Sequence, residues 1–158
     1  FLFVTLFGLG KIKFIPGTFG SFVTLIILYY LFHVLIISPS IILFGLMIVF
    51  FYSFYAVSSY IENCENKDPN EIIIDEFIGQ SIPIYLYEIS HGTVKSPNEV
   101  LIFYLICFLL FRFFDIAKPF PVSFFDKNFK NSFGVIMDDI CAGLYVVAVL
   151  VLYMVITS

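Results

Sequence analysis

Four long apolar segments divide the chain, and each approaches the length of a membrane-spanning helix. They are residues 18–37, 41–57, 99–117 and 140–156. A helix needs about 20 apolar residues to cross the hydrocarbon layer of a bilayer, with a working range of roughly 17–25. The tripeptide Ser38-Pro39-Ser40 separates the first two segments, and its proline breaks a helix. The pattern therefore predicts four membrane-spanning helices.

A fifth segment, residues 72–90, is apolar but interrupted. Asp75, Glu76, Gln80 and Pro83 lie within it, so it can cross a bilayer only if its polar face packs on other helices. Strand-like alternation is weak throughout the chain. We therefore expect an all-α fold: one domain over residues 1–158, forming a compact membrane bundle of about four to five transmembrane or membrane-buried helices.

The composition agrees with a membrane location. Of the 158 residues, 61% are apolar and 13% are charged, and the mean hydropathy is +1.03. Ordinary soluble domains are roughly half apolar and a quarter charged. The hydrophobicity excludes a disordered chain, and the net charge of -4 argues against a nucleic-acid partner. Cys64, Cys107 and Cys141 show no metal-ligand spacing, so we expect reduced, structural thiols.

The lysines predict an orientation. If residues 72–90 cross the membrane, six lysines fall on one face and only Lys95 on the other. The six are Lys11, Lys13, Lys67, Lys118, Lys127 and Lys130. Positive charge favours the cytoplasmic side of a membrane. The same topology brings three distant polar segments to that face.

Those three segments carry the chemistry. They contain Asp75 and Glu76; Arg112, Asp115 and Lys118; and Asp138 and Asp139. Together the three segments contain five carboxylates and two cationic side chains, an excess of three negative charges. A carboxylate at membrane depth is costly unless it is paired, metal-bound or wetted. Because oxygen ligands favour hard cations, a Mg²⁺ site is the expectation, ahead of Mn²⁺ or Ca²⁺.

The spacing within the segments supports a shared site. Arg112 and Asp115 stand three residues apart on one helix face, and this arrangement also fits a structural ion pair. Pro119 disfavours helix at Lys118, so the lysine should project from the helix end. Glu62, Glu65, Asp126, Lys127 and Lys130 are most simply solvated residues at the membrane interface.

Asp138 and Asp139 have two interpretations: they are site residues, or they cap the last helix. Ala142 and Gly143, four residues further on, leave room for a close neighbour.

The segment Gly8–Ser21 is rich in glycine and contains Thr18. It fits either an anion site at a helix start or an ordinary turn with an N-cap. His33 is alone in an apolar stretch, so we expect a packed or hydrogen-bonded side chain.

Four ordered motifs resemble the phosphatidylglycerophosphatase A family over nearly the whole chain. They are GxGxxxxxPGTxGS at Gly8–Ser21, DPNEIIIDEFIG at Asp68–Gly79, FRxFDxxKPxP at Phe111–Pro121, and GxxMDDxxAG at Gly134–Gly143. Phe120 departs from the pattern, since relatives often carry Trp there.

The resemblance implies a helical membrane enzyme. Such an enzyme removes the terminal phosphate of phosphatidylglycerophosphate and gives phosphatidylglycerol, with Mg²⁺ as cofactor. A multi-pass location in a bacterial inner membrane, with the site on the cytoplasmic face, is the matching expectation.

On that basis each candidate residue receives a role. The expected Mg²⁺ ligands are Asp75, Glu76, Asp138 and Asp139. Arg112 and Lys118 would hold the phosphate, with Thr18 and Ser21 as further phosphate contacts. Asp75, Glu76, Asp115 and Asp139 form the expected catalytic group. Asp115 either orients Arg112 or acts as general base, and the nucleophile is either water or a carboxylate such as Asp139.

Three alternatives remain open at the level of sequence. The protein could act on another lipid phosphate such as phosphatidic acid, because headgroup selectivity depends on pocket geometry. It could be a small transporter, which would spread its acids through the depth of the bilayer. It could also be a non-catalytic membrane subunit that uses its charged residues to contact a partner.

Overall fold

A computed structural model describes residues 2–11, 15–63, 71–90 and 96–157. The expectations for Lys13, Cys64, Lys67 and Lys95 concern residues outside these ranges.

The described residues form helices and no strand, which confirms the all-α prediction. In chain order the elements are η1 (Leu9–Lys11), α1 (Pro16–Tyr29), η2 (Tyr30–Val34), α2 (Pro39–Asn63), α3 (Ile74–Ser90), α4 (Pro97–Ala117), α5 (Val122–Asn128) and α6 (Ser132–Thr157). The π-helical turn η2 continues α1 directly. Four helices are long and apolar enough to cross a membrane: α1 with η2, α2, α4 and α6.

Local sequence accounts for most helix boundaries. Helices α1, α2 and α4 begin at prolines. Proline suits the first position of a helix because the backbone N–H there has no partner within the helix, so its loss costs nothing. At α4, Ser96 and Glu99 form a reciprocal capping box. The same helix ends where Lys118 turns to a φ of 43° before Pro119. The predicted helix end at Lys118 is therefore confirmed.

Helix α6 begins at Ser132, eight residues before the predicted apolar segment. Asn131 accepts a hydrogen bond from the N–H of Gly134 at 3.1 Å, as an N-cap does. Asp138 and Asp139 consequently lie in the second turn of the helix. The interpretation of these aspartates as helix caps is wrong.

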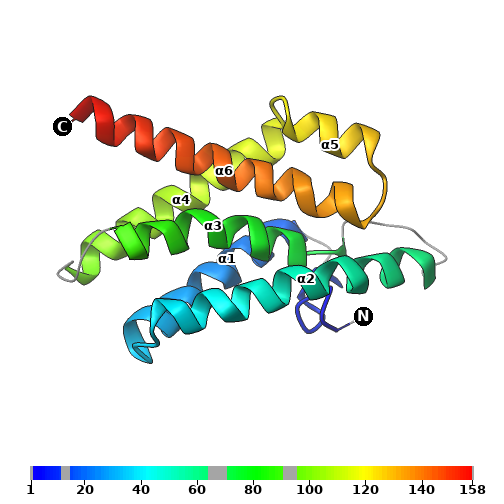
Figure 1. Ribbon diagram of the computed structural model, residues 1–158, viewed down its shortest axis with the longest axis horizontal. Coiled ribbons are helices and arrows are strands. Elements are labelled where there is room, and N and C mark those ends of the chain that lie inside the picture. Colours follow the sequence, from blue (N-terminus) through cyan, green and yellow to red (C-terminus); the bar gives the residue numbers. More distant parts are fainter. Residues whose placement is uncertain (1, 12–14, 64–70, 91–95, 158) are drawn as a thin grey trace.

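Helix α3 runs through the middle of the bundle, with α6 on one side and α2 on the other (Figure 1). It also packs against α1 and α4. Ten of its 17 residues are buried, whereas only 17–28% of each apolar span is buried inside the protein. The polar fifth segment therefore packs on other helices, as its sequence requires.

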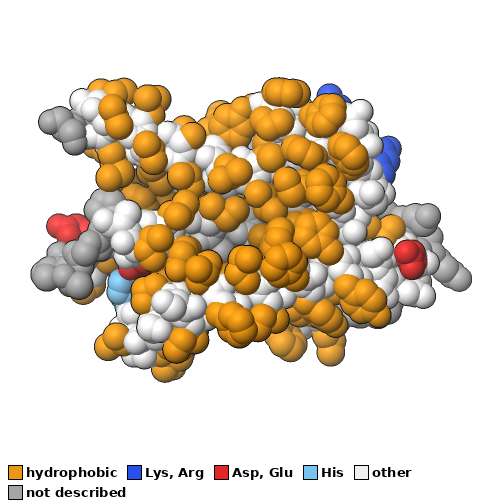
Figure 2. Space-filling model, viewed as in Figure 1, with side chains coloured by type: hydrophobic (Ala, Val, Ile, Leu, Met, Phe, Trp, Pro, Cys, Tyr) orange, Lys and Arg blue, Asp and Glu red, His pale blue; other side chains and the backbone are white. Residues whose placement is uncertain are grey.

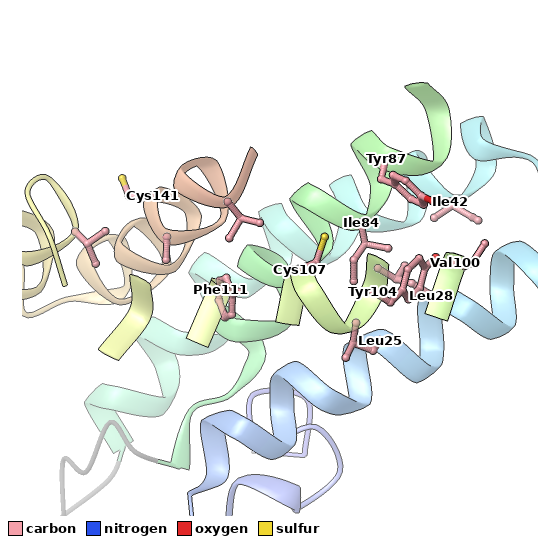
Figure 3. Close-up of a cluster of buried hydrophobic side chains, with 13 residues drawn as sticks. Leu25, Leu28, Ile42, Ile84, Tyr87, Val100, Tyr104, Cys107, Phe111 and Cys141 are labelled. Carbon is pink, nitrogen blue, oxygen red and sulfur yellow. The ribbon is translucent and has the colours of Figure 1, made fainter. Parts of the chain in front are cut away.

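Two clusters of buried side chains hold the bundle together. Figure 3 shows the larger one, where α1, α3 and α4 contribute residues such as Leu28, Ile84 and Tyr104. The smaller cluster joins the N-terminal segment to α2, α3 and α6. Cys107 and Cys141 are buried and free, as expected for structural thiols.

The outer surface is apolar between two charged ends. In Figure 2, hydrophobic side chains cover most of the face shown, and charged side chains lie near its two ends. Exposed residues of the spans include Phe44, Phe51, Leu105 and Leu152. A continuous exposed apolar surface of this kind suits the hydrocarbon of a bilayer and not water.

Helices α3 and α6 approach closely through glycines. A Cβ on Gly143 would overlap the carbonyl oxygen of Gly79, and a Cβ on Gly79 would lie 2.5 Å from the carbonyl oxygen of Asp139. Only glycine allows the two backbones to meet here. The predicted close neighbour at Gly143 is therefore confirmed.

This contact predicts the effect of one added methyl group. Gly143→Ala should lower the free energy of unfolding by about 1–3 kcal/mol, since the methyl overlaps α3 backbone. Gly45→Ala is the control because a Cβ there meets nothing within 4 Å. It should raise stability by about 0.5–1 kcal/mol through helix propensity. Denaturant titration in mild detergent measures both, and equal stabilities would contradict the close packing.

Candidate active site

A pocket of about 960 Å³ lies at one end of the bundle. The start of α1, the start of α3, the end of α4 and the second turn of α6 contribute to its wall, and α5 forms part of its rim. These elements meet near α5 in Figure 1. The titratable residues that line it are Asp75, Glu76, Arg112, Asp115, Lys118, Asp126, Lys127, Lys130, Asp138 and Asp139, together with Tyr60.

Three acids form the centre of this pocket. Asp75 and Glu76 come from the first turn of α3, and Asp139 comes from α6. Each offers a carboxylate oxygen, and these oxygens lie within 4.8 Å of one another. Asp75 and Asp139 are only 7% and 4% exposed. Three ionised carboxylates this close and this buried require a compensating cation or protons.

The donor set fits a hard divalent cation. All three groups supply oxygen, which Mg²⁺ and Ca²⁺ prefer. Among the described residues, Glu76 Oε2 and Asp139 Oδ1 are buried without a hydrogen-bond partner. Buried polar atoms normally have partners, so two free oxygens in one cluster indicate room for a ligand.

Asp138 lies apart from this cluster although it lines the same pocket. Its Oδ2 accepts a hydrogen bond from Lys118 Nζ at 3.2 Å, and its Oδ1 accepts one from the N–H of Asp139 at 3.0 Å. Neighbouring residues on a helix point about 100° apart, so the two aspartates face different partners. A metal-ligand role for Asp138 stays a prediction.

Arg112 adds a cation beside the acids. Its Nη1 donates to Asp115 Oδ2 at 2.5 Å, which confirms the predicted pairing on one helix face. Its Nε is buried without a partner. A Cβ on Gly17 would collide with the Glu76 carboxylate and would lie 3.1 Å from Arg112 Nη1. The guanidinium and the Glu76 carboxylate therefore both lie against Gly17.

Lys118 projects from the end of α4 into the same pocket. Its Nζ lies 2.5 Å from Asp126 Oδ1 and 3.2 Å from Asp138 Oδ2. Burial alone would lower the pKa of Lys118, but the hydrogen bonds and charges of Asp126 and Asp138 outweigh it and raise the pKa. The amine consequently stays protonated and can attract an anion.

Asp126 is the residue that sequence reasoning missed. It was expected to be solvated at the interface, yet it pairs with Lys118 and lines the pocket. The signal available in the sequence is the KPFP segment, which ends α4 and lets the short helix α5 fold back. Lys127 and Lys130 line the pocket for the same reason.

Thr18 and Ser21 are not among the pocket-lining residues. The Ser21 hydroxyl is buried and donates to the Gly17 carbonyl oxygen at 3.0 Å within α1. The pocket-lining residues of this segment are instead Ile15, Pro16 and Gly17. His33 lies 3.2 Å from Glu88 through Nε2 and Oε1, which confirms the expected hydrogen-bonded side chain.

The arrangement brings three clustered acids and the side chains of Arg112 and Lys118 into one pocket. The fold and the site define a helical membrane protein with a charged pocket at one end of its bundle. Residues 2–154 match the family model described as phosphatidylglycerophosphatase A, and the chain belongs to this family. It is thus an enzyme of the phosphatase class.

Several curated proteins are similar to this chain. A Haemophilus influenzae protein named "Phosphatidylglycerophosphatase A" is 34% identical over 90% of this chain and 81% of its own length. An Escherichia coli protein of the same name is 27% identical, with shares of 87% and 73%. A Bacteroides thetaiotaomicron protein named "Putative phosphatidylinositol-3-phosphatase" is 34% identical, with shares of 88% and 83%. No solved structure gives a significant match.

The tight fit at Gly17 predicts a selective loss of activity. In Gly17→Ala, the new methyl displaces the end of the Glu76 side chain, which can move without unfolding the helix. A displaced catalytic group lowers turnover strongly, so phosphate release should fall at least about tenfold while the unfolding midpoint changes little. Gly45→Ala serves as control again. Unchanged phosphate release in Gly17→Ala would contradict the assignment of Glu76 to the site.

Proposed function

We propose that this protein hydrolyses phosphatidylglycerophosphate to phosphatidylglycerol and inorganic phosphate, with Mg²⁺ bound at Asp75, Glu76 and Asp139. The observation that carries the proposal is the group of three acids, two buried and one half-buried, whose ligand oxygens lie within 4.8 Å of one another in a pocket that also contains Arg112. Family membership and two relatives named "Phosphatidylglycerophosphatase A" support the substrate.

The acids and the substrate have charges of the same sign, and this requires a cation. A phosphomonoester dianion is repelled by three carboxylates unless a bound metal reverses the local field. When bound, Mg²⁺ would polarise the phosphoryl group and offset the charge on the leaving glycerol oxygen. The free oxygens of Glu76 and Asp139 are the available ligand atoms.

Arg112 and Lys118 hold the phosphate in this proposal. The planar guanidinium of Arg112 suits two non-bridging oxygens at once, and its Nε is still free. Lys118, kept protonated by Asp126 and Asp138, adds a point charge in the same pocket. In this proposal Asp138 holds Lys118 in place and is not itself a metal ligand.

Asp115 has its main role in orientation. The 2.5 Å contact to Arg112 fixes the guanidinium at the end of α4. The other carboxylate oxygen of Asp115 could accept a proton from an attacking water, so Asp115 is also the candidate general base. In the alternative mechanism, a carboxylate attacks the phosphorus directly, and Asp139 is the candidate nucleophile.

Membrane location shapes the reaction as well. The bilayer retains the acyl chains, so the pocket must recognise only the headgroup. Lys118, Lys127 and Lys130 all line the pocket, and positive charge favours the cytoplasmic side. We therefore propose an active site at the cytoplasmic face of a bacterial inner membrane.

A second lipid phosphate deserves a direct comparison, because one relative carries the name of a phosphatidylinositol-3-phosphatase at the same 34% identity. Phosphatidic acid is the simplest further candidate. Transport is disfavoured, since the five acids assigned to the site, Asp75, Glu76, Asp115, Asp138 and Asp139, all line one pocket instead of following the length of the bundle.

Metal dependence is the first test. Purified protein should release phosphate from phosphatidylglycerophosphate with Mg²⁺ and lose this activity in EDTA. Asp75→Asn and Asp139→Asn should remove activity or raise the Mg²⁺ concentration for half-maximal rate at least about tenfold, because each removes a ligand charge. They should also abolish the rise in unfolding midpoint that Mg²⁺ gives the wild type. Glu62→Gln, outside the pocket, is the charge-matched control.

Full turnover of both aspartate variants at low Mg²⁺ would refute the metal site. Phosphate release from phosphatidic acid alone would refute the substrate while leaving the metal site intact.

Arg112→Lys tests the shape of the anion site. The substitution keeps the charge but loses the planar fork, so kcat should fall roughly 10²-fold. Phosphate-release kinetics at saturating Mg²⁺ measure the effect. A rate within twofold of the wild type would show that only the charge at this position matters.

A further inference from the structure

The rim of the pocket carries a second group of positive charges. Lys127 lies at the end of α5 and Lys130 lies between α5 and α6, and both line the pocket. Both side chains are exposed, in contrast to the buried acids at the centre. The positive rim is therefore separated in depth from the proposed metal site.

These two lysines differ from the other pocket cations in their partners. Arg112 pairs with Asp115, and Lys118 pairs with Asp126 and Asp138. Within the ranges that the structure describes, neither Lys127 nor Lys130 forms an ion pair. Their charges are consequently available to a ligand.

The surroundings of the rim place it near a membrane surface. Phe120, just before α5, is 74% exposed, and Phe124 on α5 is 44% exposed. Exposed aromatic side chains beside lysines are typical of segments that lie at the boundary of headgroups and acyl chains. Lys127 and Lys130 are therefore suited to contact a lipid headgroup at that boundary.

We propose that Lys127 and Lys130 form a second phosphate subsite, which binds the phosphodiester of the substrate while its terminal phosphomonoester enters the acid and arginine site. The proposal rests on the function proposed above. It defines the substrate class as lipids that carry both a phosphodiester and a phosphomonoester on one headgroup.

The chemistry of the two groups matches the two regions. A phosphomonoester dianion has the higher charge and meets Arg112 and the proposed metal in the buried part. The phosphodiester has one negative charge and needs only exposed point charges, which lysine supplies. A pocket of about 960 Å³ has room for both groups.

The subsite fits the two lipid phosphates that the names of the relatives mention. Phosphatidylglycerophosphate and phosphatidylinositol 3-phosphate differ in the alcohol but share the phosphodiester and the monoester. Phosphatidic acid has a monoester alone, so it would leave Lys127 and Lys130 unused. Selectivity against phosphatidic acid follows from the rim and not from the catalytic centre.

The experiment compares two substrates in mixed micelles of neutral detergent at saturating Mg²⁺. For the wild type and the Lys127→Gln/Lys130→Gln variant, kcat and KM are measured with phosphatidylglycerophosphate and with phosphatidic acid. The variant should raise KM for phosphatidylglycerophosphate roughly tenfold, as two exposed charge contacts would, with kcat within about twofold. Its KM for phosphatidic acid should not change.

Two control variants separate charge from structure. Lys127→Arg/Lys130→Arg keeps both charges and should retain the wild-type KM. Lys11→Gln removes one exposed lysine outside the pocket lining and should leave both substrates unaffected. If the double glutamine variant does not fold, each single variant should show part of the rise in KM.

An unchanged KM for phosphatidylglycerophosphate would overturn the subsite. An equal rise for both lipids would overturn it too, because it would indicate general attraction to anionic micelles. A wild-type enzyme that releases no phosphate from phosphatidylglycerophosphate would instead refute the proposed function, and the subsite with it.

Discussion

The structure depends on one electrostatic constraint, the gathering of three acidic side chains inside an apolar bundle. Asp75, Glu76 and Asp139 offer oxygens within 4.8 Å of one another; Asp75 and Asp139 are buried and Glu76 is half-buried. A lipid-facing helix could not carry such a group, because hydrocarbon solvates no carboxylate. Helix α3 is accordingly enclosed by α1, α2, α4 and α6, which present their apolar sides outward. The arrangement of the spans follows from the need to shield α3.

The glycine contact between α3 and α6 determines the geometry of the acids. Asp75 and Glu76 come from one helix and Asp139 from the other, so the distance between the helices sets the distance between the carboxylates. Gly79 meets Gly143 and the backbone at Asp139 directly. Packed helices do not change their separation continuously, since their side chains interlock. The glycines therefore serve the chemistry as well as the fold.

Much of this could be predicted from sequence, and the exceptions share a cause. Apolar length located the spans, proline located the helix ends, and i,i+3 spacing located the pair of Arg112 and Asp115. The start of α6 was missed because Asp138 and Asp139 separate the short apolar stretch 133–137 from the longer apolar run that follows. The partners of Lys118 were missed because they depend on how α5 folds back, which is a tertiary contact between Asp126 and the end of α4. The pattern of apolar and polar residues predicts which residues are exposed to solvent or lipid. It does not predict which residues from distant segments contact one another.

The short helix α5 carries an exposed aromatic side chain and also residues that line the pocket. It follows the break at Pro119 and packs on α6, so Asp126 reaches Lys118 from one side while Lys127 lies on the pocket rim. Its exposed Phe124 faces away from the bundle core. One seven-residue element thereby carries an exposed phenylalanine, a lysine of the pocket rim and an ion-pair partner of Lys118. In the proposed function, the acyl chains would stay in the bilayer while the headgroup enters the pocket that Lys127 and Lys130 line. The proposed subsite would then separate recognition of the headgroup, at these lysines, from the chemistry at the acids.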